Sequence, residues 1–162
     1  MKRLGLPIFI LALLGALAFW WFSPTQVLKR RTQTLLQTIT LESGSGKAGR
    51  QMGAYSLNAL LAREVELETP TIEEANGTFG RSSMESAFSW LCEQAKETRF
   101  ELQDFHSIQI QGDRAKVAFS LEALIELPSY RPADGRYEVV FHWQREDGAW
   151  RLSRASWVKA AR

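Results

Sequence analysis

Apolar and polar side chains alternate along most of the chain from residue 99 to residue 158. A two-residue period is typical of strands that bury one face and expose the other. Turn residues at 112–113, 128–135 and 146–148 divide the alternation into four strands. The sequence therefore predicts an antiparallel meander with one strongly apolar face. We expect the aromatic side chains of that face to be mostly buried: Phe119, Phe141, Trp143 and Trp150.

Between residues 23 and 98 the apolar positions recur every three or four residues, as they do on the buried side of a helix. A first helix is predicted over 24–41, with Ser23 as its cap and a proline at its first position. A second helix is predicted over 50–63, with Met52 and Tyr55 among its apolar residues. Two helices are thus available to cover the sheet.

A short strand is predicted at 65–67, followed by a loop over 69–81 that contains proline, asparagine and glycine. Ser82 or Ser83 is placed to cap a third helix, with Glu85 in a capping role. The apolar stripe of this helix consists of Met84, Ala87, Phe88, Leu91 and Ala95. The predicted fold class is α+β: a curved antiparallel sheet of about four long strands plus a short strand, packed on three helices and preceded by one transmembrane helix.

The segment from Leu4 to Phe22 carries no charge. Its 19 residues would span about 28 Å as a helix, which is close to the hydrocarbon thickness of a bilayer. Trp20 and Trp21 stand at its far end, where indoles favour the membrane interface. The alternative is a cleaved signal peptide, since 16–18 (Ala-Leu-Ala) fits a small-x-small cleavage site. We expect an uncleaved signal anchor that binds the lipid bilayer.

The anchor divides the chain into a basic tail at 1–3, a membrane segment at 4–22 and a domain at 23–162. Lys2 and Arg3 favour a cytoplasmic N-terminus, whereas the basic residues at 29–31 pull the other way. Because the first pair is closer to the apolar segment, we expect a single-pass protein with its domain outside the cytoplasm, on the periplasmic side if the chain is bacterial.

The charges exclude some functions. The chain has 20 Lys and Arg against 18 Asp and Glu, and Lys2 and Arg3 supply the excess, so the domain is formally neutral. A neutral domain is a poor binder of nucleic acid. Cys92 is the single cysteine and there are two histidines, so we expect no disulfide, no metal site and no cofactor. Cys92 is interpreted as an inert core thiol.

The order of elements and two hairpins resemble a known superfamily. Residues 141–152 (FHWQREDGAWRL) look like the last hairpin of nuclear transport factor 2-like proteins, and 110–117 (IQGDRAKV) resembles their central hairpin. The resemblance covers residues 24–158. It implies a curved sheet wrapped around a helix to form a cone. It does not imply one function, because this fold serves isomerases, dehydratases, cyclases, transport adaptors and membrane assembly proteins.

Enzymes of this superfamily use a carboxylate or a His/Asp pair inside the cone, as the resemblance implies. The catalytic candidates are Asp104 and His106, which are two residues apart and would share one face of a strand. The competing interpretation is that both are exposed at the start of that strand, with Phe105 pointing inward. The apolar face offers no convincing acid/base pair, so enzymatic activity is not the favoured interpretation.

The polar face of the sheet is the candidate binding surface. The residues predicted to line it are Lys116, Glu122, Glu138, His142 and Gln144. A tethered domain meets its neighbours at raised effective concentration. The favoured function is a membrane-tethered, non-catalytic scaffold or adaptor whose partners are membrane proteins or a second copy of the chain. The alternative is a small-molecule binder, or an isomerase-, dehydratase- or cyclase-like enzyme that uses the cone.

Overall fold

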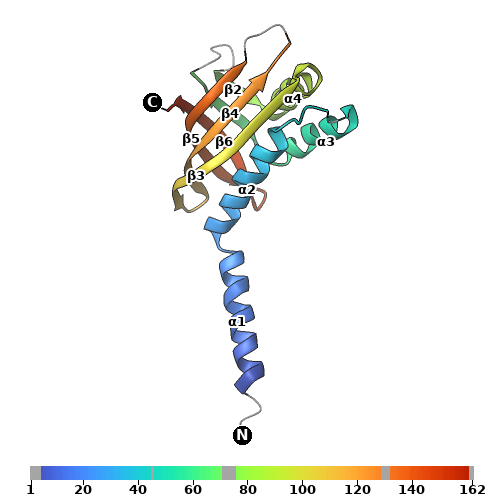
Figure 1. The fold of residues 1–162 in the computed structure, drawn as a ribbon. Coiled ribbons are helices and arrows are strands. Elements are labelled where there is room, and N and C mark those ends of the chain that lie inside the picture. Colours follow the sequence, from blue (N-terminus) through green and yellow to red (C-terminus); the bar gives the residue numbers. More distant parts are fainter. Residues whose placement is uncertain (1–4, 45, 71–75, 129–131, 161–162) are drawn as a thin grey trace.

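The computed structural model describes residues 5–44, 46–70, 76–128 and 132–160. The helices are α1 (Gly5–Trp21), α2 (Pro24–Ile39), α3 (Lys47–Asn58) and α4 (Arg81–Gln94). The strands are β1 (Leu61–Glu68), β2 (Gly77–Gly80), β3 (Glu97–Gln111), β4 (Arg114–Glu126), β5 (Ala133–Glu146) and β6 (Ala149–Lys159). Figure 1 shows α1 leaving the rest of the fold as a stalk, while the other helices pack on one face of the sheet.

The strands form one mixed sheet in the order β2-β1-β6-β5-β4-β3. The pairs β3–β4, β4–β5 and β5–β6 are antiparallel, which confirms the predicted meander. β1 adds to it in parallel with β6, and β2 pairs with β1 in antiparallel fashion. The prediction that residues 69–81 form only a loop is wrong at 77–80. Residues 77–80 pair with β1, with Phe79 opposite Val65, and so form an edge strand.

Aromatic side chains fill the face of the sheet that the helices cover. Phe119, Phe141 and Trp143 are fully buried, and Trp150 is buried too, as the alternation predicted. Phe141 packs edge-on against Phe119 at 4.9 Å between ring centroids and against Trp143 at 6.2 Å. This face is called the inner face below, and the opposite one the outer face.

α2 lies against the inner face and begins where the sequence predicts. The Ser23 hydroxyl accepts a hydrogen bond from the Gln26 amide, at 3.5 Å. The buried stripe of α2 consists of Leu28, Thr32, Leu35 and Leu36. The helix ends at Ile39, two residues earlier than predicted, because Leu41 pairs with Thr98 of β3 instead.

The second and third helices differ from prediction at their ends. α3 spans Lys47–Asn58 rather than 50–63, since the chain enters β1 at Leu61. Met52 and Tyr55, named among the apolar residues of the predicted helix, do lie on α3, and their side chains are 73% and 80% exposed.

α4 begins at Arg81, directly after Gly80, and its first turn has no side-chain cap. The predicted caps Ser82 and Ser83 lie inside the helix, and Glu85 accepts a hydrogen bond from the Asn58 amide instead. In the predicted stripe Phe88 is buried, but Ala87 is exposed.

The apolar N-terminal segment forms α1. Leu4 lies outside the described residues, and Phe22 follows the last residue of the helix. The large apolar side chains of α1 from Phe9 onward are exposed, and Phe19 is 84% exposed. In the described part of the chain, no single helix is long and apolar enough to cross a membrane. The segment Phe9–Trp21 and α2 meet that criterion only as a pair, with a 54° bend between them.

Candidate functional site

No carboxylate or imidazole is buried on the inner face of the cone among the described residues. The buried polar side chains in this part of the chain are Thr32, Thr98 and Ser120, and none of them is a carboxylate or an imidazole. Thr98 is satisfied by the main chain of α2: its hydroxyl donates to the Ile39 carbonyl at 2.6 Å and accepts from the Leu41 amide at 2.9 Å. The inner face is therefore a packed core.

Two polar atoms inside that core lack hydrogen-bond partners among the described residues. They are the hydroxyl oxygen of Thr32 on α2 and the indole Nε1 of Trp143 on β5, and both residues are fully buried. An unpaired buried polar group costs about 1–3 kcal/mol, so each of these atoms would gain from a water molecule or a ligand atom.

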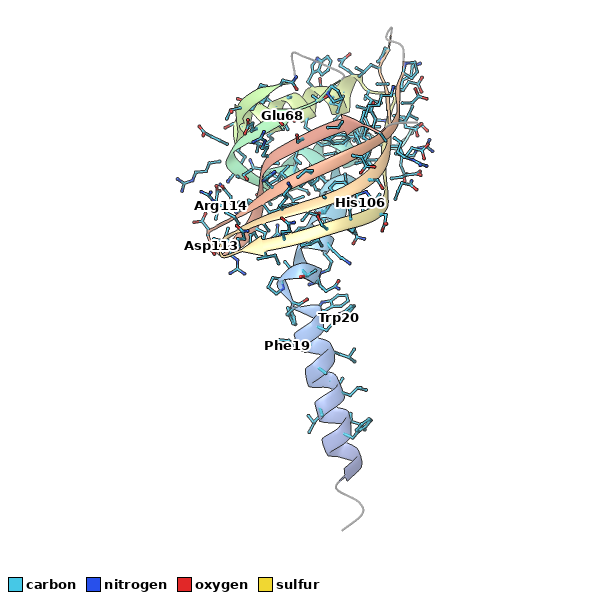
Figure 2. All side chains as sticks on the ribbon, turned by 90° about the vertical axis from the view of Figure 1, so that its left-hand side faces the viewer. Phe19, Trp20, Glu68, His106, Asp113 and Arg114 are labelled. Atoms are coloured by element: carbon cyan, nitrogen blue, oxygen red, sulfur yellow. The ribbon has the colours of Figure 1, made fainter. Side chains whose placement is uncertain are left out.

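The catalytic candidates Asp104 and His106 are exposed on β3 and point away from the cone. Two irregularities in the β3–β4 pairing, one before Asp104 and one after Phe105, interrupt the simple alternation. The imidazole Nε2 of His106 lies 2.9 Å from a carboxylate oxygen of Glu138 on β5, so its partner is this glutamate. Phe105 points inward and contacts Phe119, as expected. Figure 2 labels His106 on the sheet.

The five predicted surface residues all lie at outward-facing positions, as the alternation requires. Lys116 is opposite both Gln109 and His142, His142 is opposite Arg154, and Arg154 is opposite Glu66. One polar row thus crosses β3, β4, β5, β6 and β1. The other predicted residues of this face, Glu122, Glu138 and Gln144, lie on the same side of β4 and β5.

Arg154 anchors a charged cluster that the sequence analysis did not single out. Its guanidinium lies 2.5 Å from a carboxylate oxygen of Glu68 and 3.6 Å from Glu66. The Ser156 hydroxyl donates to the second oxygen of Glu68 at 2.7 Å. These two hydrogen bonds lower the pKa of Glu68. The cluster joins two strands that are distant in sequence, which local periodicity cannot reveal.

His142 stands beside this cluster and is half-buried. Burial lowers its pKa, and the nearby charges of Arg154 and Lys116 lower it further. The imidazole is therefore kept neutral at neutral pH. No group of three or more His, Cys, Asp or Glu side chains placed to hold a metal ion occurs among the described residues.

A surface hollow of about 700 Å³ lies where the end of α2, α3 and the start of β3 meet. Arg50 lines this hollow and connects α3 to the segment after α2 and to the end of α4. The guanidinium donates to the carbonyls of Glu42, Cys92, Ala95 and Lys96 at 2.7 to 3.2 Å. Three of these main-chain carbonyls lie at the end of α4 and that of Glu42 follows α2, so Arg50 serves the fold, as a cation at a helix C-terminus does.

Cys92 is buried beside this arginine, as the sequence analysis expected. Burial raises the pKa of its thiol, which donates a hydrogen bond to the Arg50 carbonyl at 3.4 Å. A thiol with a raised pKa carries little thiolate, so Cys92 is a core residue and a poor nucleophile.

No protein-family model matches the chain, and no curated protein matches it in sequence. Solved structures do match it in fold. A protein from Novosphingobium aromaticivorans, provisionally named a scytalone dehydratase, has a TM-score of 0.63 at 14% identity, over 85% of this chain and 84% of its own. An NTF2-like protein from Cytophaga hutchinsonii has a TM-score of 0.62 at 18% identity, over 86% of this chain and 100% of its own.

A third match is an uncharacterised protein with a cystatin-like fold from Caulobacter vibrioides. Its TM-score is 0.64 at 11% identity, over 85% of this chain and 89% of its own. Identities this low carry the fold and no activity. The chain has the nuclear transport factor 2-like, cystatin-like fold across most of its length, which confirms the resemblance noted in its hairpins.

Proposed function

We propose that this chain is a membrane-tethered, non-catalytic binding module that acts as a scaffold or adaptor subunit. The observation that carries the proposal is the packed inner face: fully buried Phe119, Phe141 and Trp143 stand where enzymes of this fold would hold substrate, and no carboxylate or imidazole is buried among the described residues. A general base must reach its substrate in the pocket, and Asp104 and His106 point to solvent instead.

The tether in this proposal is α1. Its 17 residues rise about 25 Å, which lies at the short end of the range for membrane helices. Its apolar side chains face solvent, which is unfavourable in water and favourable in a bilayer. Trp20 and Trp21 then lie at the interface next to the domain. The proposed orientation places Lys2 and Arg3 in the cytoplasm and the domain outside, and protection of the domain from added protease in intact cells tests it.

The binding surface in this proposal is the outer face of the sheet. It carries both signs of charge, and Lys116 and Glu138 are exposed there. Mixed charge of this kind favours specific protein contacts over binding to a polyanion. The partner is a membrane protein, which the tether holds at raised effective concentration.

The test is purification of the full chain from its own membranes in mild detergent, with quantification of every protein that accompanies it. We expect a stoichiometric membrane-protein partner. The variant Lys116→Ala/His142→Ala should lose it, whereas Lys96→Ala, at an exposed lysine between α4 and β3, should keep it. Recovery of the chain alone, as one monodisperse species, would contradict the proposal.

Two other results of that purification would change the proposed surface or partner. Loss of the partner only with Met52→Ser/Tyr55→Ser would place docking on α3, since both side chains are exposed there. A stable dimer of the chain without a second protein would replace the hetero-partner by a second copy.

A second candidate function is the binding of a small molecule in the cone, which the unpartnered atoms of Thr32 and Trp143 favour. Native mass spectrometry of the purified chain tests it. A bound molecule that is lost in Thr32→Val/Trp143→Phe, with the fold retained, would support the ligand function. A chain of unmodified mass in all preparations would exclude it.

A further inference from the structure

Basic side chains gather at the end of the domain from which α1 leaves. Lys29, Arg30 and Arg31 occupy the first two turns of α2, so Arg31 is only about 10 Å along α2 from its first residue. The Arg30 guanidinium donates to the Trp21 carbonyl at 2.7 Å and lies 4.4 Å from the centre of the Trp21 ring. Arg30 is thereby held against the last residue of α1.

The two hairpin turns of the meander lie at one end of the sheet. The Arg145 amide donates to the Asp113 carbonyl at 2.9 Å, which joins the β5–β6 hairpin to the β3–β4 hairpin. Arg114 is opposite Gln144, and Gln144 is opposite Arg151, so these side chains share the last rows of the sheet. Figure 2 shows Asp113 and Arg114 at the end of the sheet toward α1, with Phe19 and Trp20 on α1 beyond them.

The basic groups of this end are not neutralised by carboxylates. Among the described residues, Arg31, Arg114 and Arg151 form no ion pair. The Nε of Arg151 is buried without a hydrogen-bond partner. Burial and the nearby charge of Arg151 lower the pKa of Arg31, as expected where two guanidinium groups lie near each other without an anion.

Carboxylates are few at this end and more numerous at the other. Near the hairpins stand Asp113, Glu146 and Asp147, and Glu146 already binds Arg81 at 3.1 Å. The opposite end of β3, β4 and β5 carries Glu97, Glu101, Glu122, Glu126 and Asp134. The far end also carries basic side chains, at Lys96, Arg99, Arg136 and Lys159, so its charges are nearly balanced. The excess of basic groups in this formally neutral domain therefore lies at the end next to α1.

We infer that this basic end is a platform for the phosphates of anionic lipid headgroups, and that it docks the domain on the bilayer surface that α1 enters. The platform consists of Lys29, Arg30, Arg31, Arg114, Arg145 and Arg151. This inference rests on the proposed membrane tether. All six belong to the end of the domain from which α1 leaves, and an anionic surface attracts basic groups that come within about a Debye length of it, roughly 8 Å.

The platform differs from the tether in what it recognises. α1 responds to the apolar interior, which neutral and anionic bilayers share, whereas the platform responds to headgroup charge. Each basic side chain near an anionic surface raises membrane affinity about fivefold. The docked population should therefore rise with the anionic lipid content and fall with added salt.

The experiment uses the full chain reconstituted in vesicles of pure phosphatidylcholine and in vesicles that also contain phosphatidylglycerol. Hydrogen exchange is measured for the hairpin amides at 111–114 and 146–149. We expect slower exchange with the anionic lipid, and loss of that difference in Arg31→Gln/Arg114→Gln. The matched variant Arg99→Gln/Arg136→Gln removes the same charge from the opposite end of the sheet and should keep the difference.

The outcomes separate the platform from the tether. A chain that does not float with phosphatidylcholine vesicles contradicts the tether, whatever the hairpins do. A chain that floats with both vesicles and shows equal hairpin exchange in both overturns the platform alone. Slower exchange in neutral vesicles on addition of inorganic phosphate would also overturn it, because the site would then hold a free anion and not a lipid headgroup.

Discussion

Trp143 lies on the inner face with 1% of its surface exposed and packs against Phe141. Replacing it with alanine removes the indole and leaves a cavity, so Trp143→Ala should lower the free energy of unfolding by about 3–5 kcal/mol. Urea unfolding of the full chain in detergent, followed by circular dichroism, measures this. Trp90, at 56% exposed, is the matched control, and its alanine variant should lose less than about 1 kcal/mol. Equal losses would mean that the inner face is not the core.

His142 makes a pH-dependent contribution to stability. Its pKa in the folded chain is lowered by burial, by Arg154 and by Lys116, so the unfolded chain binds a proton first as the pH falls. The folded state is therefore penalised below the ordinary histidine pKa of about 6.5, and its stability rises with pH through that window. His142→Gln removes the penalty. The difference in unfolding free energy, variant minus parent, should become more positive as the pH falls from about 7.5 to about 5.5.

The control for this titration is His106→Gln. His106 is the other histidine of the chain and lies beside Glu138, so a rise of the same size in this variant would mean that the effect is not specific to His142. A difference between His142→Gln and the parent that stays constant with pH would show that the imidazole is not held neutral.

The alternation of side chains predicts which face a single residue occupies only where the strand is regular. It placed Phe119, Phe141 and Trp143 inside because a strand period of two leaves no other choice once one face is buried. It placed Asp104 and His106 side by side on one face, but two irregularities in β3 break that period and give His106 a partner two strands away. Bulges add residues without a sequence signal of their own.

At the scale of elements, Arg50 holds three segments together. Its guanidinium donates to main-chain carbonyls at the end of α4 and after α2, and its own carbonyl accepts from the Cys92 thiol. Hydrogen bonds from a charged donor contribute about 1.5–3 kcal/mol each, and their acceptors would be left unpaired in Arg50→Ala. We expect this variant to lose at least about 2 kcal/mol of unfolding free energy.

Thiol labelling gives a local readout of the same change. Cys92 lies on α4 and is buried against α3, so a disulfide reagent should react slowly with the parent and much faster with Arg50→Ala. Arg63→Ala, at an exposed arginine on β1, is the control and should leave the labelling rate unchanged. Unchanged labelling in Arg50→Ala would mean that the packing of α3 on α4 does not depend on the arginine.

Elements that are defined by local signals were predictable, and those defined by distant pairing were not. The start of α2 follows from Ser23 and Pro24 alone. β2 has four residues and a glycine at each end, and it exists because it pairs with β1. The helix predicted over 50–63 is too long at its C-terminal end for a similar reason. The residues from Leu61 onward belong to β1, whose partner β6 lies about 90 positions later in the sequence.

At the scale of the molecule, the fold could be predicted and the function could not. The meander, the covering helices and the hairpins at 110–117 and 141–152 were sufficient to suggest this fold. The five residues predicted for the polar face lie on one face of the sheet, and their role in binding stays a prediction. The Arg154 cluster and the basic end at α1 combine residues from several elements that only the assembled fold brings together. The total charge, which is zero for the domain, therefore hides the excess of basic groups at one end.

The proposed role of α1 as a membrane tether can be tested at Leu13. In the proposed topology Leu13 lies near the middle of α1 and would face hydrocarbon, and its side chain is exposed in the folded chain. An arginine at the centre of a membrane helix costs about 2.5–3.5 kcal/mol relative to a favourable leucine, so Leu13→Arg should shift the chain from the membrane pellet to the supernatant. Leu13→Ile keeps the apolar character and should stay in the pellet. Because Leu13 touches no part of the sheet, a soluble Leu13→Arg chain should keep the circular dichroism and unfolding free energy of the domain. If Leu13→Arg stays in the pellet after carbonate extraction, α1 is not the element that holds the chain to the membrane.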